Sequence, residues 1–357
     1  MDYKERKEFE LKRAEEFIAS INAMNDPDIM YKVSHPITDL KDMMNKSVER
    51  YGADHVAFKQ RFAKNEPFRE ITYGQTLEDL NALGTALIEH GLKDKRVAVI
   101  GRNRYEWIVA HLSVLLGGMV SVPLDKELKI DELENSLIRS EVEAIVFDEK
   151  YVELIEKLKQ RGNTKIKEYI CMSEIPEYRS VDMLIKDGQK YLRSGYKDYL
   201  NCKIDKNKMS ILLFTSGTTS KSKAVMLSQK NIASNIYALQ LSEDFYDTDV
   251  NIAFLPFHHI FGQTGMLLMI INGVKTVFTD GLRYISQNFK EYGVSVFVGV
   301  PILIEAIYNN VWQQIRKQRK EKLVRLLIKV SNILLKVKID IRRKLFKNII
   351  DGLGGKH

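Results

Sequence analysis

The chain has 357 residues, of which 45% are hydrophobic and 29% charged, and its 55 Lys and Arg exceed its 47 Asp and Glu to give a net charge of +8. This composition predicts a large globular core and excludes an intrinsically disordered chain. The two cysteines, Cys171 and Cys202, fit no metal-binding or redox spacing, and no uncharged apolar run is long enough to span a bilayer, so the sequence favours a cytoplasmic protein with inert thiols.

The first 45 residues are predicted to form a helical N-terminal extension. A charged helix is expected over residues 1–25, where Asn-Asp-Pro-Asp ends it, and it lacks the apolar core of a secretory signal. A second helix is expected over residues 37–51, with Thr38 as its N-cap.

Residues 46–205 are predicted to form a first subdomain of sheet and helices. Short apolar strands that alternate with helical segments are typical of βαβ units on a parallel sheet, where each strand is buried on both faces. We expect the polar, Tyr-rich residues 171–206 to link this sheet to a second one. The predicted strands are 56–62, 95–101, 120–124 and 143–148, and the predicted helices are 72–92, 105–116 and 130–140.

Residues 206–300 are predicted to form a second sheet subdomain, with strands over 211–214 and 294–300, and residues 301–357 a basic helical region. Between residues 311 and 350, thirteen Lys and Arg stand against two acidic residues, and apolar residues recur every three or four positions. Such a helix suits peripheral contact with an anionic membrane, and a solvated face of an ordinary bundle is the alternative. Because the chain ends soon after Gly352 and Gly354, we expect a truncated domain whose next strand is absent.

The loop that follows the strand 211–214 carries the strongest chemical signal. Residues 215–223 are crowded with hydroxyl side chains, one Gly and two Lys, a combination that supplies many donors and positive charge to a polyphosphate. The loop is not a Walker A motif, because Ser222 and Ala224 stand where that motif requires Gly and then Ser or Thr. This mismatch excludes a P-loop phosphohydrolase.

The stretch Thr215-Ser-Gly-Thr-Thr-Ser-Lys-Ser-Lys-Ala-Val resembles the Thr-Ser-Gly-Thr-Thr-Gly-x-Pro-Lys-Gly-Val signature of adenylate-forming (AMP-binding) enzymes and matches seven of its ten specified positions. The resemblance implies that this loop holds the β- and γ-phosphates of ATP and that Lys223 is also catalytic. Ser220, Ser222 and Ala224 depart from the signature, but every donor survives, so we expect function to be retained. The implied ATP-binding residues are Thr215, Ser216, Gly217, Thr218, Thr219, Ser220 and Lys223.

A second segment, Leu255-Pro-Phe-His-His-Ile-Phe-Gly, resembles the family's Leu-Pro-x-x-His segment, which borders the carboxylate and the α-phosphate. His259 occupies the His position of that segment, and the resemblance implies a catalytic role in which it orients the carboxylate. An acyl pocket is expected nearby, with core packing as the alternative for each of its residues. The expected pocket residues are Phe257, His258, Phe297, Val300 and Pro301.

The chain is therefore similar to the N-terminal part of a long-chain fatty-acid–CoA ligase, because smaller-substrate members of the family usually lack a basic helical insertion such as 301–357. The implied fold is α/β, an acyl-CoA-synthetase-like N-terminal domain with mixed and parallel sheets sandwiched by helices in layers. The implied reaction joins a fatty acid to ATP as acyl-AMP and then to coenzyme A, with Mg²⁺. The family's later Tyr-Gly-x-Thr-Glu segment, ribose-binding Asp and C-terminal Lys are not found, so we expect no metal ligand in this chain and negligible turnover by it alone.

Two other interpretations stay open at this point. Ligation to an acyl-carrier protein, or adenylation of another carboxylate, would use the same loop. A non-enzymatic module that binds a membrane or a nucleic acid through residues 311–350 would explain the basic helix but not the loop, and we expect no nucleic-acid partner. A homodimer, and a location at the inner face of the membrane, are compatible with the sequence.

Overall fold

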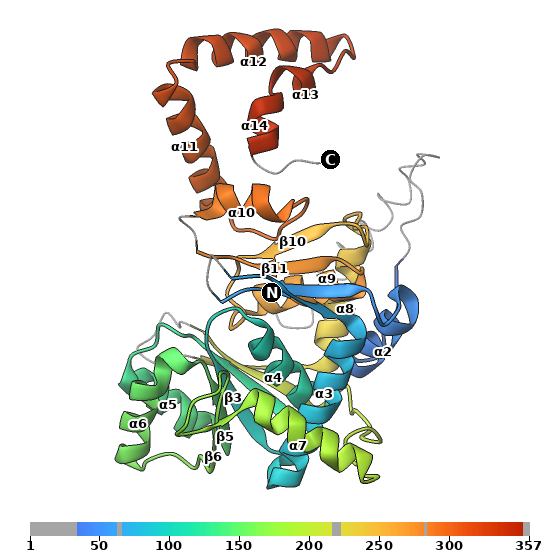
Figure 1. Cartoon of the computed structure of the whole chain (residues 1–357), viewed down its shortest axis with the longest axis vertical. Helices are drawn as coiled ribbons and strands as arrows, with labels where there is room; N and C mark the ends of the chain where they lie inside the picture. Colours follow the sequence, from blue (N-terminus) through green and yellow to red (C-terminus); the bar gives the residue numbers. More distant parts are fainter. Residues whose placement is uncertain (1–33, 63–65, 216–222, 282–283, 353–357) are drawn as a thin grey trace, which may run out of the picture.

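The computed structural model describes residues 34–62, 66–215, 223–281 and 284–352. The helix predicted over residues 1–25 lies outside this part of the chain. Within it, helices and strands alternate as predicted and assemble into layers around two sheets (Figure 1).

The larger sheet has seven strands in the order β7-β6-β5-β3-β4-β8-β9. All neighbouring strands are parallel except β8 and β9, which form an antiparallel pair. The central strands are buried on both faces, which explains their unbroken runs of Val, Ile and Ala. The strands are β3 (Arg96–Ile100), β4 (Val120–Leu124), β5 (Ala144–Phe147), β6 (Glu168–Cys171), β7 (Arg179–Ser180), β8 (Met209–Thr215) and β9 (Lys223–Ser228).

The smaller sheet has four strands in the order β10-β11-β1-β2. Here β1 is parallel to β11, with Phe58 opposite Thr276, and antiparallel to β2. The strands are β1 (Val56–Gln60), β2 (Arg69–Thr72), β10 (Val250–Ala253) and β11 (Lys275–Phe278).

Each sheet therefore combines strands from both halves of the chain. The expectation that residues 171–206 link two sheets is wrong, because β6 and β8, the strands before and after this segment, belong to the same sheet, as does β7 within it. The division predicted at residue 205 does not coincide with the division between the sheets, because pairing across more than 200 residues leaves no local trace in the sequence.

Helices cover both faces of the larger sheet, and three of them pack together on the face that is turned toward the smaller sheet. Every residue of α4 (Tyr105–Leu116) is buried between the sheets. It packs on α3 (Tyr73–Leu87), and α3 in turn packs on α7 (Val181–Arg193). On the opposite face, α5 (Ile130–Ser140) and α6 (Val152–Arg161) enclose a second apolar cluster. This is the layered α/β arrangement that the sequence predicts.

The remaining helices complete these layers. The helix predicted over residues 37–51 is α2 (Leu40–Tyr51), and its N-cap is Asp39 rather than Thr38. The Asp39 carboxylate accepts from the amides of Lys41 and Asp42, which a hydroxyl one residue earlier does not reach. The other short elements are η1 (Ile88–Leu92), η2 (Glu149–Tyr151), α8 (Gln229–Gln240), α9 (Ile260–Ile271) and α10 (Ile285–Tyr292).

Four helices extend from α10 away from the sheets, as Figure 1 shows. The basic region predicted to be helical consists of α11 (Pro301–Lys317), α12 (Glu321–Lys336), α13 (Arg342–Leu345) and α14 (Lys347–Gly352). The strand predicted over residues 294–300 is wrong, because only Val296 bridges Asn251 and the neighbouring residues find no strand partner among those that the structure describes. None of the described helices is long and apolar enough to cross a lipid bilayer.

Candidate functional site

The two sheets bring the carboxyl ends of their parallel strands to one place. Strands β3, β4, β5 and β8 are parallel and end at one edge of the larger sheet, and β1, β10 and β11 end at one edge of the smaller sheet. Ligands of open α/β sheets bind outside the carboxyl ends of the strands. The topology therefore points to the region between these edges.

An open cleft of about 660 Å³ lies in this region. Its lining residues follow six different strands, and five of them are Lys or Arg. They are Gln60, Arg61, Phe62, Gly101, Arg102, Asn103, Arg104, Lys126, Lys150, Phe254, Pro256, Phe278, Thr279, Asp280, Gly281 and Tyr284.

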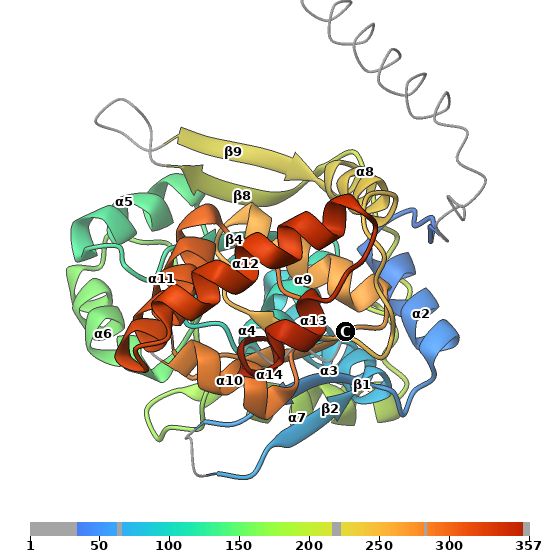
Figure 2. The same cartoon turned by 90° about the horizontal axis from the view of Figure 1, so that it is seen from above.

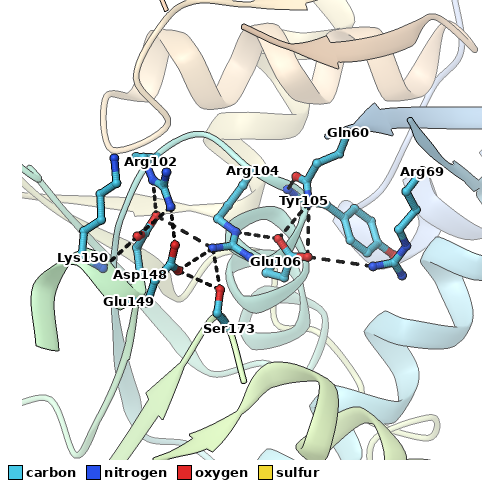
Figure 3. A network of polar contacts seen from close by, with 10 residues as sticks. All are labelled: Gln60, Arg69, Arg102, Arg104, Tyr105, Glu106, Asp148, Glu149, Lys150 and Ser173. Carbon is cyan, nitrogen blue, oxygen red and sulfur yellow. Dashed lines mark hydrogen bonds and ion pairs between the residues drawn. The ribbon is translucent and has the colours of Figure 1, made fainter. Parts of the chain in front are cut away.

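Two of the arginines are fixed by carboxylates, as Figure 3 shows. The Arg102 guanidinium donates two hydrogen bonds to the Asp148 carboxylate, from Nε to Oδ2 at 2.6 Å and from Nη2 to Oδ1 at 3.0 Å. Arg104 donates to Glu106 at 2.6 Å and to Glu149 at 2.8 Å. These charge-assisted bonds tie the end of β3 to the end of β5 and hold both guanidinium groups in one geometry.

The network keeps the Glu149 carboxylate ionised. Burial raises the pKa of Glu149, but a hydrogen bond from Ser173 and the charges of Arg104 and Arg102 outweigh it and lower the pKa to about 2. Asp148 is fully buried and lies against Arg102. Around neutral pH the arginines are therefore neutralised by their partners.

Two lysines of the cleft differ from the arginines in their partners. Among the described residues, the Nζ atom of Lys126 has one ion-pair partner, Glu127, at 3.7 Å. Lys150 makes no ion pair with any residue in the described part of the chain, and its side chain extends beside Arg102 in Figure 3. An anionic ligand in the cleft would find the Lys150 ammonium group without an acidic partner among the described residues, and Lys126 with one partner, Glu127, at 3.7 Å.

The opposite wall is closed by a buried ion pair at the ends of β1 and β11. Arg61 donates to Asp280 at 2.6 Å and to Glu291 at 2.7 Å, and its side chain is only 5% exposed. Burial opposes the ionisation of Asp280, but hydrogen bonds from Arg61, Tyr292 and Asn288 lower its pKa. This group holds α10 against the smaller sheet.

Asn103 fixes the segment of residues 255–259, which carries the two histidines. Its Nδ2 donates to the carbonyl of Leu255 at 2.7 Å, and its Oδ1 accepts from the amide of Phe257 at 3.0 Å. The side chain thus replaces a strand partner for this irregular segment. Asn103 itself lies directly after β3, so the larger sheet sets the position of a segment that follows the smaller one.

The two histidines differ in environment. His258 is 9% exposed, and its Nε2 lies 3.4 Å from Asp125 Oδ1 without the geometry of a hydrogen bond. Burial lowers the pKa of His258 to about 4, against the opposing effect of Asp125. His259 is exposed and is the N-cap of α9. The centroids of the His258 and His259 rings lie 4.3 Å apart. Neither side chain lines the cleft, although Pro256 and Lys126 beside them do.

The loop predicted to bind ATP phosphates joins the antiparallel strands β8 and β9. Thr215 ends β8, Lys223 begins β9, and the two residues pair across the hairpin with exposed side chains. Five of the residues predicted to bind ATP lie outside the described residues: Ser216, Gly217, Thr218, Thr219 and Ser220. Thr215 and Lys223 do not line the cleft, although β8 ends at the same sheet edge as β3 and β4.

The residues predicted to line an acyl pocket are not brought together. Phe257 is buried against Trp107, with ring centroids 5.3 Å apart. Phe297 lines a separate apolar groove of about 330 Å³ together with Phe289, Val294, Ser295, Ile304, Ile307 and Ile350. Val300 and Pro301 are the N-cap and first residue of α11, and neither lines this groove.

The arginines and lysines of the cleft and Asn103 were not predicted from the sequence. Their signal was their place directly after predicted strands, as in Gly101-Arg-Asn-Arg and Asp148-Glu-Lys. Because parallel strands end at one edge, polar residues after successive strands converge, and this rule would have found them.

The chain is similar in sequence to one family of enzymes. The pattern of the AMP-binding enzyme family matches residues 44–354. A mouse protein named long-chain-fatty-acid–CoA ligase 5 is 27% identical over 82% of this chain and 46% of its own length. A chloroplastic long-chain-fatty-acid–[acyl-carrier-protein] ligase from Arabidopsis thaliana is 26% identical over 94% of this chain and 48% of its own length. The chain thus spans about half the length of these relatives.

Solved structures show the same fold. A long-chain-fatty-acid–CoA ligase from Archaeoglobus fulgidus superposes with a TM-score of 0.66 at 20% identity, over 80% of this chain and 56% of that chain. An anthranilate–CoA ligase gives 0.65 at 18% identity, over 80% and 53%.

Proposed function

Because the chain belongs to the family of AMP-binding enzymes, we propose that its protein activates a long-chain fatty acid with ATP and transfers the acyl group to coenzyme A. The observation that carries this proposal is the place of the hydroxyl- and lysine-rich loop. It starts where β8 ends, at the sheet edge where four of the five Lys and Arg residues of the cleft follow β3, β4 and β5.

The loop is proposed to hold the β- and γ-phosphates of ATP. Thr215 and Lys223 flank it as exposed donors at the loop end of the hairpin. The donors within it are proposed to be Ser216, Thr218, Thr219 and Ser220, with Gly217 letting the backbone approach the phosphates. Lys223 would stabilise the charge that gathers on the departing pyrophosphate.

His259 is proposed to orient the fatty-acid carboxylate. It caps α9, a helix of 12 residues whose first amides and dipole favour an anion at this end. His258, buried and neutral, is proposed to pack at the edge of the site rather than to carry charge.

The proposed chemistry runs in two steps. A carboxylate oxygen attacks the α-phosphorus of ATP, the bond from that phosphorus to the bridging oxygen breaks, and pyrophosphate leaves. The thiol of coenzyme A then loses its proton and attacks the acyl carbon, and AMP leaves with the electron pair of the carbon–oxygen bond. Mg²⁺ would neutralise phosphate charge when bound. Among the described residues no group of three or more His, Cys, Asp or Glu could hold a metal ion, so none of the residue roles proposed here depends on it.

The cleft and the apolar groove support the choice of substrates. Lys150, which has no ion-pair partner among the described residues, leaves positive charge in the cleft, and this charge suits a phosphorylated substrate such as ATP or coenzyme A. The groove lined by Phe297 is almost entirely apolar, and we propose that it accepts part of an acyl chain. Core packing accounts for Phe257, and Val300 and Pro301 serve the start of α11.

The decisive experiment is fatty-acid-dependent exchange of pyrophosphate into ATP, measured with the protein as its source gene encodes it. We expect Lys223→Ala to slow this exchange at least tenfold, since removing one donor to a developing anion typically lowers kcat by 10² to 10³. Lys230→Ala, an exposed lysine at the start of α8, is the matched control and keeps the wild-type rate. Absence of exchange with every chain length would refute the proposed function, and an unchanged Lys223→Ala rate would remove that residue from the site.

An acyl-carrier protein as thiol acceptor is the second candidate, because a relative of similar coverage carries that name. Offering both acceptors to the acyl-AMP intermediate separates the two. A homodimer stays a prediction, which sedimentation velocity tests.

A further inference from the structure

The helix α12 exposes a stripe of large aliphatic side chains. They recur at alternating spacings of three and four residues, which places them on one face of the helix. Their exposed fractions, between 40% and 65%, are far above those of the core. The stripe consists of Leu323, Leu326, Val330, Ile333 and Val337.

A row of three lysines borders this stripe. Lys322, Lys329 and Lys336 each stand one residue before a member of the stripe, at the same seven-residue spacing, so they share one flank of it. All three are exposed and none makes an ion pair with a described residue. The single acidic residue of α12, Glu321, is already paired with Arg316 and Arg325.

The stripe is a second apolar face rather than the packing face of the helix. The neighbouring face holds Ser331, only 2% exposed, and the half-buried Val324, Leu327 and Leu334. That face already serves the packing of the helix. The stripe and its lysine row are therefore available to contact a partner other than the described residues.

The position of α12 lets the stripe meet a flat surface. Figure 1 places α12 at the end of the molecule opposite α5, α6 and α7, and in Figure 2 it lies over the rest of the chain. Helix α11 supports it, with the Arg325 guanidinium 4.7 Å from the centre of the Trp312 ring. On α11 itself, Tyr308 is 60% exposed beside Trp312, and such amphipathic rings favour the headgroup region of a bilayer.

From these observations we propose that α12 is a docking surface for an anionic lipid bilayer, with the aliphatic stripe entering the headgroup region and the lysine row binding lipid phosphates. Thirteen Lys and Arg against two acidic residues over residues 311–350 supply the complementary charge.

Charge also decides between this occupant and two others. Two copies docked through the same stripe would bring two segments of equal, high positive charge together, and their repulsion opposes association. A nucleic acid would use the lysines but would leave the aliphatic stripe in water. A lipid surface uses both features. The inference does not rest on the proposed ligase activity, because its readout is vesicle binding.

The experiment is co-sedimentation of the whole chain with phosphatidylcholine vesicles, with and without phosphatidylglycerol. We expect binding only to the anionic vesicles, and weaker binding as salt is raised. Two variants separate the features: Lys322→Gln/Lys329→Gln/Lys336→Gln removes the charge, and Leu326→Gln/Val330→Gln/Ile333→Gln removes the stripe. The matched control is Lys203→Gln/Lys206→Gln/Lys208→Gln, which removes three exposed lysines before β8.

The lysine variant should bind roughly a hundredfold more weakly, since each lysine near an anionic surface contributes about a fivefold factor. The stripe variant should lose binding to a similar degree, and the control should bind like the wild type. Unchanged thermal unfolding of each variant shows that the helix is intact. Wild-type binding retained in either α12 variant overturns the proposal. So does a wild-type dimer that the stripe variant turns into a monomer, or RNA binding that depends on the lysines in a chain that ignores vesicles.

Discussion

At the scale of single residues, Asn103 connects the two sheets through one side chain. It holds the carbonyl of Leu255 and the amide of Phe257, so the segment that carries His258 and His259 has its position set by β3. Because a residue after β3 of the larger sheet holds residues 255–257, the position of this segment does not depend on the smaller sheet alone.

Replacing this residue tests the connection. We expect Asn103→Ala to destabilise the fold by about 1–3 kcal/mol, since buried partners lose their hydrogen bonds, and to abolish hydrogen-exchange protection of the Phe257 amide. Asn103→Asp keeps the acceptor and should keep that protection. Asn163→Ala, which removes only an exposed contact with Glu134, is the control. Equal protection of Phe257 in Asn103→Ala and wild type would contradict this role.

Two buried histidines make the stability of the folded protein depend on pH. Burial lowers the pKa of His111 to about 3 and of His258 to about 4, below the value of about 6.5 in an unfolded chain. As the pH falls below about 6.5, the unfolded state therefore binds more protons, and stability is lost progressively, down to about pH 4 for His258 and about pH 3 for His111.

This loss can be assigned by substitution. We expect His258→Gln to retain on the order of 1–3 kcal/mol more of its neutral-pH stability at pH 4.5 than the wild type does. Urea unfolding at several pH values measures it. Parallel stability curves for the two proteins would show that His258 is not the group that titrates.

At the scale of elements, the residue pattern predicts most helices and strands but not their assembly. The fully apolar runs of β3, β4 and β5 and the spacing of leucines in α3 are local signals, and those elements form within a few residues of their predicted bounds. The antiparallel partner of β8 gave no such signal, because most of β9 is exposed and its residues do not alternate between apolar and polar. The segment before Pro301 has strand composition, yet it finds only one bridge.

The candidate site was predictable to the same degree. The family resemblance supplied the loop and the histidine segment, and the structure adds the cations that follow β3, β4 and β5. Those residues are unremarkable in the sequence, since their meaning depends on which strands end side by side.

The crossing of α3 and α7 depends on one residue without a side chain. A Cβ at Gly188 would lie 1.8 Å from the carbonyl oxygen of Ala82, so any larger residue must push the helices apart. We expect Gly188→Ala to lower the free energy of unfolding by about 1–3 kcal/mol, although alanine is the better helix former. Gln189→Ala in the same helix should change it by less than about 0.5 kcal/mol. Stabilisation of Gly188→Ala would mean that the helices do not approach so closely.

At the scale of the whole molecule, the sheets share strands from both ends of the sequence. A cut at residue 205 would remove β8 and β9 from the larger sheet and separate β1 and β2 from β10 and β11. We expect the fragments 34–205 and 206–352 to lack cooperative thermal unfolding when made separately, whereas the intact chain unfolds cooperatively. Cooperative unfolding of residues 206–352 alone would contradict this interdependence.

The pairing of Phe58 with Thr276 also matters while the protein is being made. At about 5–20 residues per second, roughly 10–40 s pass on the ribosome between synthesis of β1 and synthesis of its parallel partner. During that delay the β1–β2 hairpin presents a bare strand edge, the kind of template on which nascent chains stick to one another. We therefore expect chaperones that shield this waiting edge to govern the yield of correctly folded protein in the cell.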